Sequence, residues 1–182
     1  STNGNNGNTS EPRAVEKVEL YKYREGAEKH RLEAQKLVYG PWISYANVDM
    51  SASDIRSTFK TKFEGLLREP LPENVHLLTF ESWKENSFLV RLEHMFEAHE
   101  HPTLSKDVDV QLKTLLADYN VTDAVELSLG ANQVKSNTQR LHWRHESPTV
   151  EIQSHPLTSD LLVKLQPMEI RTFQLFVEPI QS

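Results

Sequence analysis

The sequence predicts a mainly β protein, an antiparallel β-sandwich preceded by a short helix and an irregular linker. Two observations support this fold class. Seven or eight short runs of alternating apolar and polar residues, separated by polar turns, follow one another from residue 71 to the end of the chain. No helical pattern interrupts them, which is typical of a sandwich rather than of a sheet with crossover helices.

The stretch 71–96 predicts a hairpin that organises the later strands. Its second half alternates strictly, so one face is expected to carry one set of residues and the other face another: Phe88, Val90, Leu92, His94 and Phe96 against Leu89, Arg91, Glu93 and Met95. The first half, 75–80, is apolar at most positions, which predicts burial on both faces. The polar segment 81–86 supplies the turn.

The later strands follow the same alternation. Residues 107–112 have the clearest inside-outside pattern, with Val108 and Val110 inward and Asp109 outward. Residues 125–129 predict a further strand that ends at Gly130. The remaining runs are 141–143, 150–152, 161–165 and 167–177, and in the last of these Arg171, Phe173, Leu175 and Val177 are expected to share a face.

The N-terminal part has a different composition. Residues 1–12 are almost entirely Asn, Gly, Ser and Thr, which cannot bury enough apolar surface to offset backbone ordering, so we expect a disordered or processed tail. Residues 27–38 then predict a helix with Ala27, Arg31, Ala34 and Val38 along one narrow apolar stripe. Gly40-Pro41 is a typical helix stop.

The segment 42–70 allows two interpretations. Ile55, Phe59, Phe63 and Leu66 have helical spacing after a possible cap at Ser53-Asp54, whereas several poor helix formers around them favour an extended or irregular linker. The family resemblance given below favours the irregular linker. In either case its aromatic residues have no obvious covering element within the chain.

Composition excludes several classes of function. The formal charge is -6, with 20 basic and 26 acidic residues, which is unfavourable for a nucleic-acid surface. Eight histidines would bring the charge to roughly +2 in acid if all were protonated. There is no cysteine, and no apolar run approaches the length of a membrane span, so we expect neither disulfides nor a transmembrane segment.

No motif gives a catalytic site. His99 and His101 alternate as two metal ligands would, but they lack the spacing of a helical zinc site and lie in a polar loop. Nucleophile-elbow and phosphate-loop patterns do not occur. Trp42, Trp83 and Trp143 could form an aromatic platform for a sugar, although Trp143 alternates with Leu141 as a core residue would.

Several segments together resemble a known family. These are Val75-His76-Leu77-Leu78-Thr79 with Trp83 after it, Leu89 to Phe96, Leu127 to Gln133, Leu141-His142-Trp143, and Pro167 to Phe173. In this order they are similar to the C-terminal β region of lysosomal α-mannosidases, the glycoside hydrolases of family 38. The resemblance spans about residues 71–177. Before it, His30-Arg31-Leu32 and Phe63-Glu64-Gly65-Leu66 are the recognisable pieces.

The resemblance implies the C-terminal non-catalytic part of a zinc-dependent, retaining acid α-mannosidase that cleaves terminal non-reducing mannose from glycoprotein glycans. The family's nucleophile and zinc ligands belong to an N-terminal domain outside these 182 residues, so no catalytic or metal-binding residue is expected here. Residues 13–70 would dock on other parts of the enzyme, and 71–182 would form the sandwich. A lysosomal or secreted location follows. The alternative is a free-standing, secreted glycan-binding or interaction module.

Two kinds of site remain as expectations. Asn120 and Asn8 each begin a glycosylation triplet, and Asn120 is expected in a loop. A domain interface is expected to involve Arg91, Glu93, His94, Phe59 and Phe63, with Arg91 and Glu93 on one strand face and able to pair.

Overall fold

The computed structural model of the chain describes residues 18, 20, 26–41, 43–59, 61–63, 65–84, 86–138 and 155–180. Within them lie the helices α1 (Gly26–Val38) and α2 (Ala52–Thr58) and the 3-10 helix η1 (Lys135–Asn137). The strands are β1 (Val75–Ser82), β2 (Ser87–His94), β3 (Val108–Gln111), β4 (Tyr119–Leu127), β5 (Leu162–Leu165) and β6 (Ile170–Pro179).

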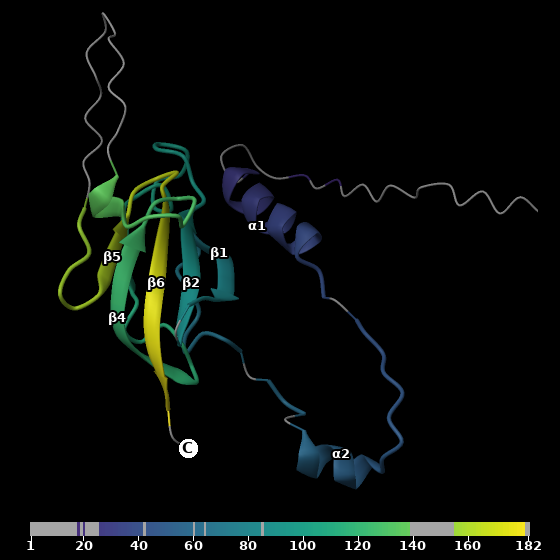
Figure 1. The fold of residues 1–182 in the computed structure, drawn as a ribbon. Helices are drawn as coiled ribbons and strands as arrows, with labels where there is room; N and C mark the ends of the chain where they lie inside the picture. Colours follow the sequence, from purple (N-terminus) through teal and green to yellow (C-terminus); the bar gives the residue numbers. More distant parts are fainter. Residues whose placement is uncertain are drawn as a thin grey trace, which may run out of the picture.

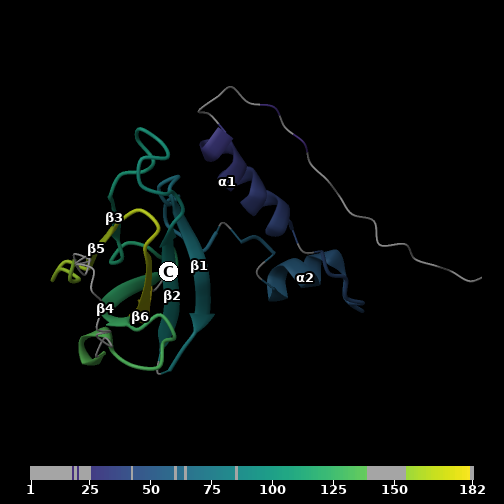
Figure 2. The same ribbon diagram turned by 90° about the horizontal axis from the view of Figure 1, so that it is seen from above.

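The strands form two antiparallel sheets packed face to face. One has the order β1-β2-β6-β4 and the other consists of β3 and β5. Figure 1 shows β1, β2, β6 and β4 side by side, and Figure 2 shows β3 and β5 together on one side of this four-stranded sheet, which we call its inner face. Buried side chains from all six strands join a single apolar cluster. The predicted antiparallel sandwich is therefore confirmed.

The hairpin forms as its alternation predicts. Val90 and Leu92 of β2 are completely buried on the inner face, opposite Phe173 and Arg171 of β6. The first strand differs from expectation, because the register shifts between Leu77 and Thr79 and leaves Leu78 exposed. A bulge adds one residue to a strand and changes the face of the next, so two-sided burial of this run was a wrong prediction.

The third strand and the last two strands agree with the sequence pattern. In β3, Val110 is buried and Asp109 is exposed. In β5, Val163 and Leu165 are buried. The inner face of β6 carries the expected set, all of it buried: Arg171, Phe173, Leu175 and Val177.

Strand β4 begins at Tyr119, six residues before the predicted start at 125. A register shift between Val121 and Asp123 explains the error, because Val121 and Ala124 both face the core and the two-residue period is lost between them. Asn120 therefore lies within a strand and not in a loop, and Leu129 lies beyond the strand. The runs expected at 141–143 and 150–152 fall outside the described residues.

Helix α1 forms where a helix was expected. Val38, which belongs to the predicted apolar stripe, is 72% exposed. The expectation of an irregular segment was wrong for residues 52–58, which form α2. Ser51 caps that helix, since its hydroxyl accepts a hydrogen bond from the Asp54 amide at 3.2 Å. None of the α2 residues is buried. Neither helix is long and apolar enough to cross a membrane.

The chain joins the sandwich before residue 71. Leu66 and Leu67 pack against the core, and Leu67 forms an isolated β-bridge with Leu116. Gly65 precedes them with φ of 122°, a conformation that residues with a side chain rarely adopt. The domain limits proposed from sequence stay a prediction, and the tail 1–12 lies outside the described residues.

Candidate functional site

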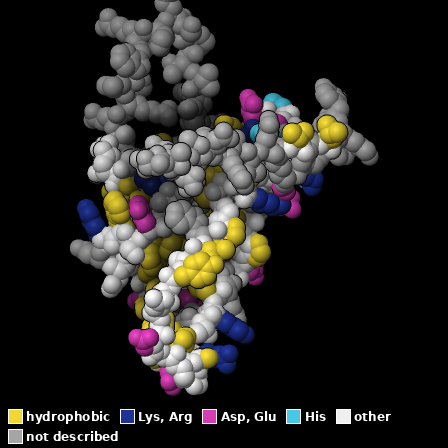
Figure 3. Space-filling view, turned by 90° about the vertical axis from the view of Figure 1, so that its right-hand side faces the viewer, with side chains coloured by type: hydrophobic (Ala, Val, Ile, Leu, Met, Phe, Trp, Pro, Cys, Tyr) yellow, Lys and Arg dark blue, Asp and Glu magenta, His cyan; other side chains and the backbone are white. Residues whose placement is uncertain are grey.

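A large exposed apolar surface lies on residues 37–63, which we call the exposed arm. Tyr45 is 93% exposed, Phe63 70% and Phe59 56%. The other large apolar side chains exposed there are Leu37, Val38, Tyr39, Ile43, Val48 and Met50. Figure 3 shows hydrophobic side chains at the surface on this side of the molecule. Apolar surface of this extent on a soluble protein usually marks a contact with another chain or domain.

Helix α1 connects the exposed arm to the sandwich through Arg31. The guanidinium binds both carboxylate oxygens of Glu100, with Nη2–Oε1 at 2.9 Å and Nη2–Oε2 at 2.8 Å. It also lies over the Phe96 ring, 5.7 Å from the centroid. Burial tends to raise the pKa of Glu100, but hydrogen bonds from Arg31 and from the Glu97 amide outweigh it and hold the pKa below its ordinary value.

The hairpin side of this contact includes one of the predicted interface residues. Glu93 accepts a hydrogen bond from His76 Nδ1 at 3.2 Å, and the His76 ring stacks at a tilt on Tyr39 with centroids 5.4 Å apart. Glu93 and Met95 also line a hollow of about 210 Å³ against α1. The predicted Glu93 position therefore lies where the N-terminal segment meets the sandwich.

Arg91 is on the same outer face as Glu93 but has different partners. It donates to the Thr79 hydroxyl at 3.2 Å and to the Leu129 carbonyl at 3.2 Å. These contacts hold the loop after β4 across the outer face of the sheet. The pairing of Arg91 with Glu93 considered from sequence is thus replaced by separate hydrogen bonds within the domain.

His94 is completely buried inside the sandwich. Its Nδ1 accepts the Phe96 amide hydrogen at 3.2 Å, so Nε2 must carry the proton of the neutral ring and donate it to the Lys106 carbonyl at 2.9 Å. Asn74 donates to the Leu104 carbonyl next to it at 3.1 Å. His94 therefore anchors the loop 95–107 through these hydrogen bonds. Because it is buried inside the domain, it can contribute to a domain interface only indirectly.

A buried ion pair lies between β4 and β6 of the four-stranded sheet and connects this sheet with β5 of the two-stranded sheet. Arg171 of β6 donates to both carboxylate oxygens of Glu126 on β4, and its third donor reaches the Lys164 carbonyl on β5 at 2.9 Å. The Arg171 side chain is 1% exposed and that of Glu126 14%. Burial tends to raise the pKa of Glu126, but hydrogen bonds from Arg171 and Lys135 outweigh it and lower the pKa.

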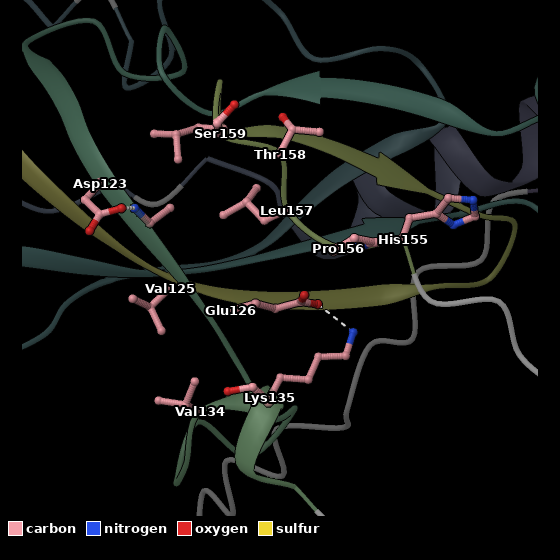
Figure 4. A pocket seen from close by; sticks show the side chains of 13 residues that line it. Asp123, Val125, Glu126, Val134, Lys135, His155, Pro156, Leu157, Thr158 and Ser159 are labelled. Carbon is pink, nitrogen blue, oxygen red and sulfur yellow. Dashed lines mark hydrogen bonds and ion pairs between the residues drawn. The ribbon is translucent and has the colours of Figure 1, made fainter.

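A cavity of about 670 Å³ opens beside this ion pair, between β4, η1 and residues 155–161. Figure 4 shows Glu126 and Lys135 on one side of it, joined by the 2.6 Å contact, with Leu157 and Thr158 opposite. Among the described residues, its wall combines aliphatic, small polar and charged groups with the His155 imidazole, and none of these residues is Phe, Tyr or Trp. Arg171 and Glu126 bind one another here and therefore act as structural groups.

The remaining candidate residues are the histidines considered as metal ligands, the tryptophans considered as a sugar platform, and Asn8. Within the described residues, no three His, Asp or Glu side chains gather to hold a metal ion. His101 Nδ1 instead accepts the Thr103 and Leu104 amide hydrogens, at 3.3 and 3.1 Å, and His99 is exposed. Trp83 is half-buried, whereas Trp42, Trp143 and Asn8 lie outside the described residues.

Residues 74–173 match the family model of the glycosyl hydrolases family 38 C-terminal beta sandwich domain. This match covers more than half of the chain and most of the sandwich described above, from β1 into β6. The chain therefore belongs to this family, and the resemblance found from the motifs is confirmed.

Three α-mannosidases show which members of the family the chain is similar to. The chain is 36% identical over 162 residues to the lysosomal alpha-mannosidase of Felis catus, covering 88% of this chain and 16% of that protein. The lysosomal alpha-mannosidase of Homo sapiens is 35% identical over 151 residues, covering 82% and 15%. The alpha-mannosidase of Canavalia ensiformis is 31% identical over 166 residues, covering 87% and 16%. The chain thus spans about one sixth of the length of these relatives.

One feature of the sequence could have predicted the Arg171–Glu126 pair, namely an arginine on an apolar strand face. Arg171 was expected to share a strand face with three large apolar residues, and a buried guanidinium requires an anionic partner. Glu126 was the candidate that strand register would have supplied, because it lies opposite Phe173 on β6. The Arg31–Glu100 pair had no comparable signal, since its partners are 69 residues apart and one of them is in a loop.

Proposed function

We propose that this chain is the C-terminal, non-catalytic part of a lysosomal-type acid α-mannosidase. The assembled enzyme would hydrolyse terminal non-reducing α-D-mannose residues of glycoprotein glycans in the lysosome. The observation that carries the proposal is the similarity to lysosomal α-mannosidases along 88% of the chain, combined with its coverage of only 16% of such a protein. A piece of this size would depend on the remainder for the reaction.

The zinc ion and the retaining nucleophile of the proposed enzyme would lie in the remainder. The described part of this chain does not fit a zinc ion, because its histidines are scattered and several are committed to backbone or carboxylate contacts. Its own task would be to complete the enzyme's folded structure.

The exposed arm is the proposed contact with the preceding domains. Its aromatic side chains, Tyr45, Phe59 and Phe63, would be buried there, while α1 and the Arg31–Glu100 pair keep the arm attached to the sandwich. Permanent interfaces between parts of one protein commonly bury more than about 2,000 Å². An arm of about two dozen residues with apolar groups along its length suits an interface of that class.

Co-expression with the preceding part of the same protein tests this proposal. We expect the two parts to co-purify at pH 5 and at pH 7.5 and to release mannose from a synthetic α-mannoside together. Phe59→Ser combined with Phe63→Ser should abolish co-purification. The matched control is Ile180→Ser, which removes an apolar side chain that is 40% exposed at the far end of β6.

Two results would reject the proposal. One is a well-folded monomer that ignores the preceding part at both pH values. The other is mannoside hydrolysis by this chain alone. A monomer that instead binds mannose-containing glycans would support the free-standing glycan-binding module.

A further inference from the structure

Asn120 begins one of two Asn-x-Ser/Thr triplets in the chain. It lies on β4, which forms one edge of the four-stranded sheet, and it is exposed. Its strand partner is the exposed Glu178, while the adjacent pair Val121–Val177 is buried in the core. Because side chains alternate along a strand, Asn120 projects from the outer face, away from β3 and β5.

We propose that Asn120 carries an N-linked glycan in the whole protein, and that this glycan keeps the corner where β4 begins and β6 ends in contact with solvent. An N-linked glycan is bulky and strongly hydrated, so it requires a surface that no other domain covers. The proposal rests on the proposed function, since N-glycosylation requires the secretory route that a lysosomal enzyme takes.

The surroundings of Asn120 suit such a group. Besides Glu178, the exposed polar or acidic residues at this corner are Asp118, Thr122 and Asp123, and the exposed apolar residues there are Pro179 and Ile180. Thr122, the third residue of the triplet, donates from its hydroxyl to the Phe176 carbonyl at 3.2 Å. This contact fixes the local strand geometry with Asn120 directed outward. The polar and acidic residues around Asn120 contrast with the exposed arm, because water solvates the apolar surface of the arm poorly.

Most of the docking surface would lie at the edge of the sheet opposite the glycan. The end of the exposed arm is the exception, because Phe63 lines a hollow together with Asp118, two residues before Asn120. Strand β1 forms the edge opposite β4, with β2 and β6 between them. Figures 1 and 2 show α1 and α2 on the β1 side. A glycan at Asn120 would therefore leave free the part of the exposed arm that carries α1 and α2, which places the preceding domains on the β1 side of the sandwich in this proposal.

Site occupancy is measured on the whole protein from its native source. Trypsin releases residues 114–135 as one peptide that contains Asn120 and no second triplet. We expect this peptide to be glycosylated, and peptide N-glycosidase in heavy-oxygen water to convert Asn120 to labelled aspartate. Asn120→Gln in the recombinant whole protein should remove the mass of one glycan and leave assembly and mannosidase activity unchanged.

A second measurement tests the assignment of the edges. Lys36→Asn combined with Val38→Thr creates a new triplet on the exposed side of α1, whereas Val38→Thr alone creates none. The new glycan should prevent co-purification with the preceding part of the protein. The control variant should assemble as the natural protein does.

Each contrary outcome rejects a defined part. An unmodified peptide 114–135, in a protein whose other triplets carry glycans, rejects the Asn120 site alone. A protein without any N-linked glycan rejects the site and the lysosomal route together. Normal assembly despite an occupied triplet on α1 rejects the placement of the partner on the β1 side.

Discussion

Arg171 on β6 holds both carboxylate oxygens of Glu126 on β4, with Nε–Oε1 at 2.8 Å and Nη2–Oε2 at 2.7 Å. Its third nitrogen, Nη1, donates to the Lys164 carbonyl, and the guanidinium lies 5.3 Å from the centroid of the Phe173 ring. One nearly inaccessible side chain thus connects two strands of the large sheet with the small sheet. This arrangement makes the sandwich dependent on a charge pair as well as on its apolar core.

Replacing Glu126 by Gln should destabilise the sandwich strongly. The substitution keeps the shape of the side chain but leaves the Arg171 charge buried without an anion, which typically costs about 3–5 kcal/mol. Urea unfolding followed by tryptophan fluorescence measures the loss. Lys135→Gln is the control, because the Lys135 side chain is 44% exposed and such pairs contribute at most about 1 kcal/mol. Equal losses in the two variants would contradict the structural role of Arg171.

The same pair should make stability depend on pH only in strong acid. Because the native pKa of Glu126 is lowered, the unfolded chain takes up the proton first as the pH falls. The stabilisation is complete above the unfolded carboxyl pKa of about 4.3 and is lost as the pH passes down through the native pKa. The difference in unfolding free energy between the natural chain and Glu126→Gln should therefore stay constant from pH 7 to pH 5 and shrink below about pH 4. A difference that already shrinks between pH 7 and pH 5 would contradict the lowered pKa.

Leu92→Ala should cost about 2–5 kcal/mol of unfolding free energy, the usual range for truncating a buried leucine. Leu92 is completely buried on β2, where its strand partners are Leu77 of β1 and Arg171 of β6. Asp109→Ala should cost less than about 0.5 kcal/mol, since surface changes are usually of that size. Asp109 is 49% exposed in its side chain and lies 3.5 Å from Lys164 Nζ. A larger effect at Asp109 would mean that the faces of β3 are assigned wrongly.

The inward and outward faces of a strand could be predicted from the sequence where the strand is regular. The strict alternation of β2 and β3 gave correct faces because burial on one side selects apolar residues at every second position. The first hairpin strand and β4 gave errors because each contains a bulge, at Leu78 and after Val121, that alternation alone does not reveal. Helix α2 was missed because its stability comes locally from the Ser51 cap and not from an apolar stripe.

The exposure of Phe59 and Phe63 was predictable for a different reason, and the domain interface that they are expected to form stays a prediction. Phe59 and Phe63 were noted as apolar residues with nothing in the chain to cover them, and their exposure in the structure agrees with that reasoning. The contacts of His94 were not predictable, because they involve carbonyl groups of a loop whose path depends on the folded structure. Alternation placed His94 inward, and only the three-dimensional structure explains how its ring is satisfied there.

Arg31→Gln should release α1 from the sandwich without unfolding the sandwich. The ion pair with Glu100 is partly exposed and contributes up to about 1 kcal/mol, and the contact with the Phe96 ring adds about 0.5–1 kcal/mol. Together they correspond to a decrease of about 2- to 30-fold in the hydrogen-exchange protection of residues 26–38. Lys36→Gln is the matched control, because the Lys36 side chain is 70% exposed and its ion pair is with Glu33 of its own helix.

The pH dependence of this docking distinguishes the ion pair from simple apolar packing. The lowered pKa of Glu100 keeps its carboxylate charged above about pH 4.3, so the protection factors of α1 should be the same at pH 5 and pH 7 in the natural chain. Below that range, protection should fall toward the level of Arg31→Gln, which itself should not change with pH. Protection that is already lost at pH 5, or that is unaffected by Arg31→Gln, would show that α1 is held by other contacts.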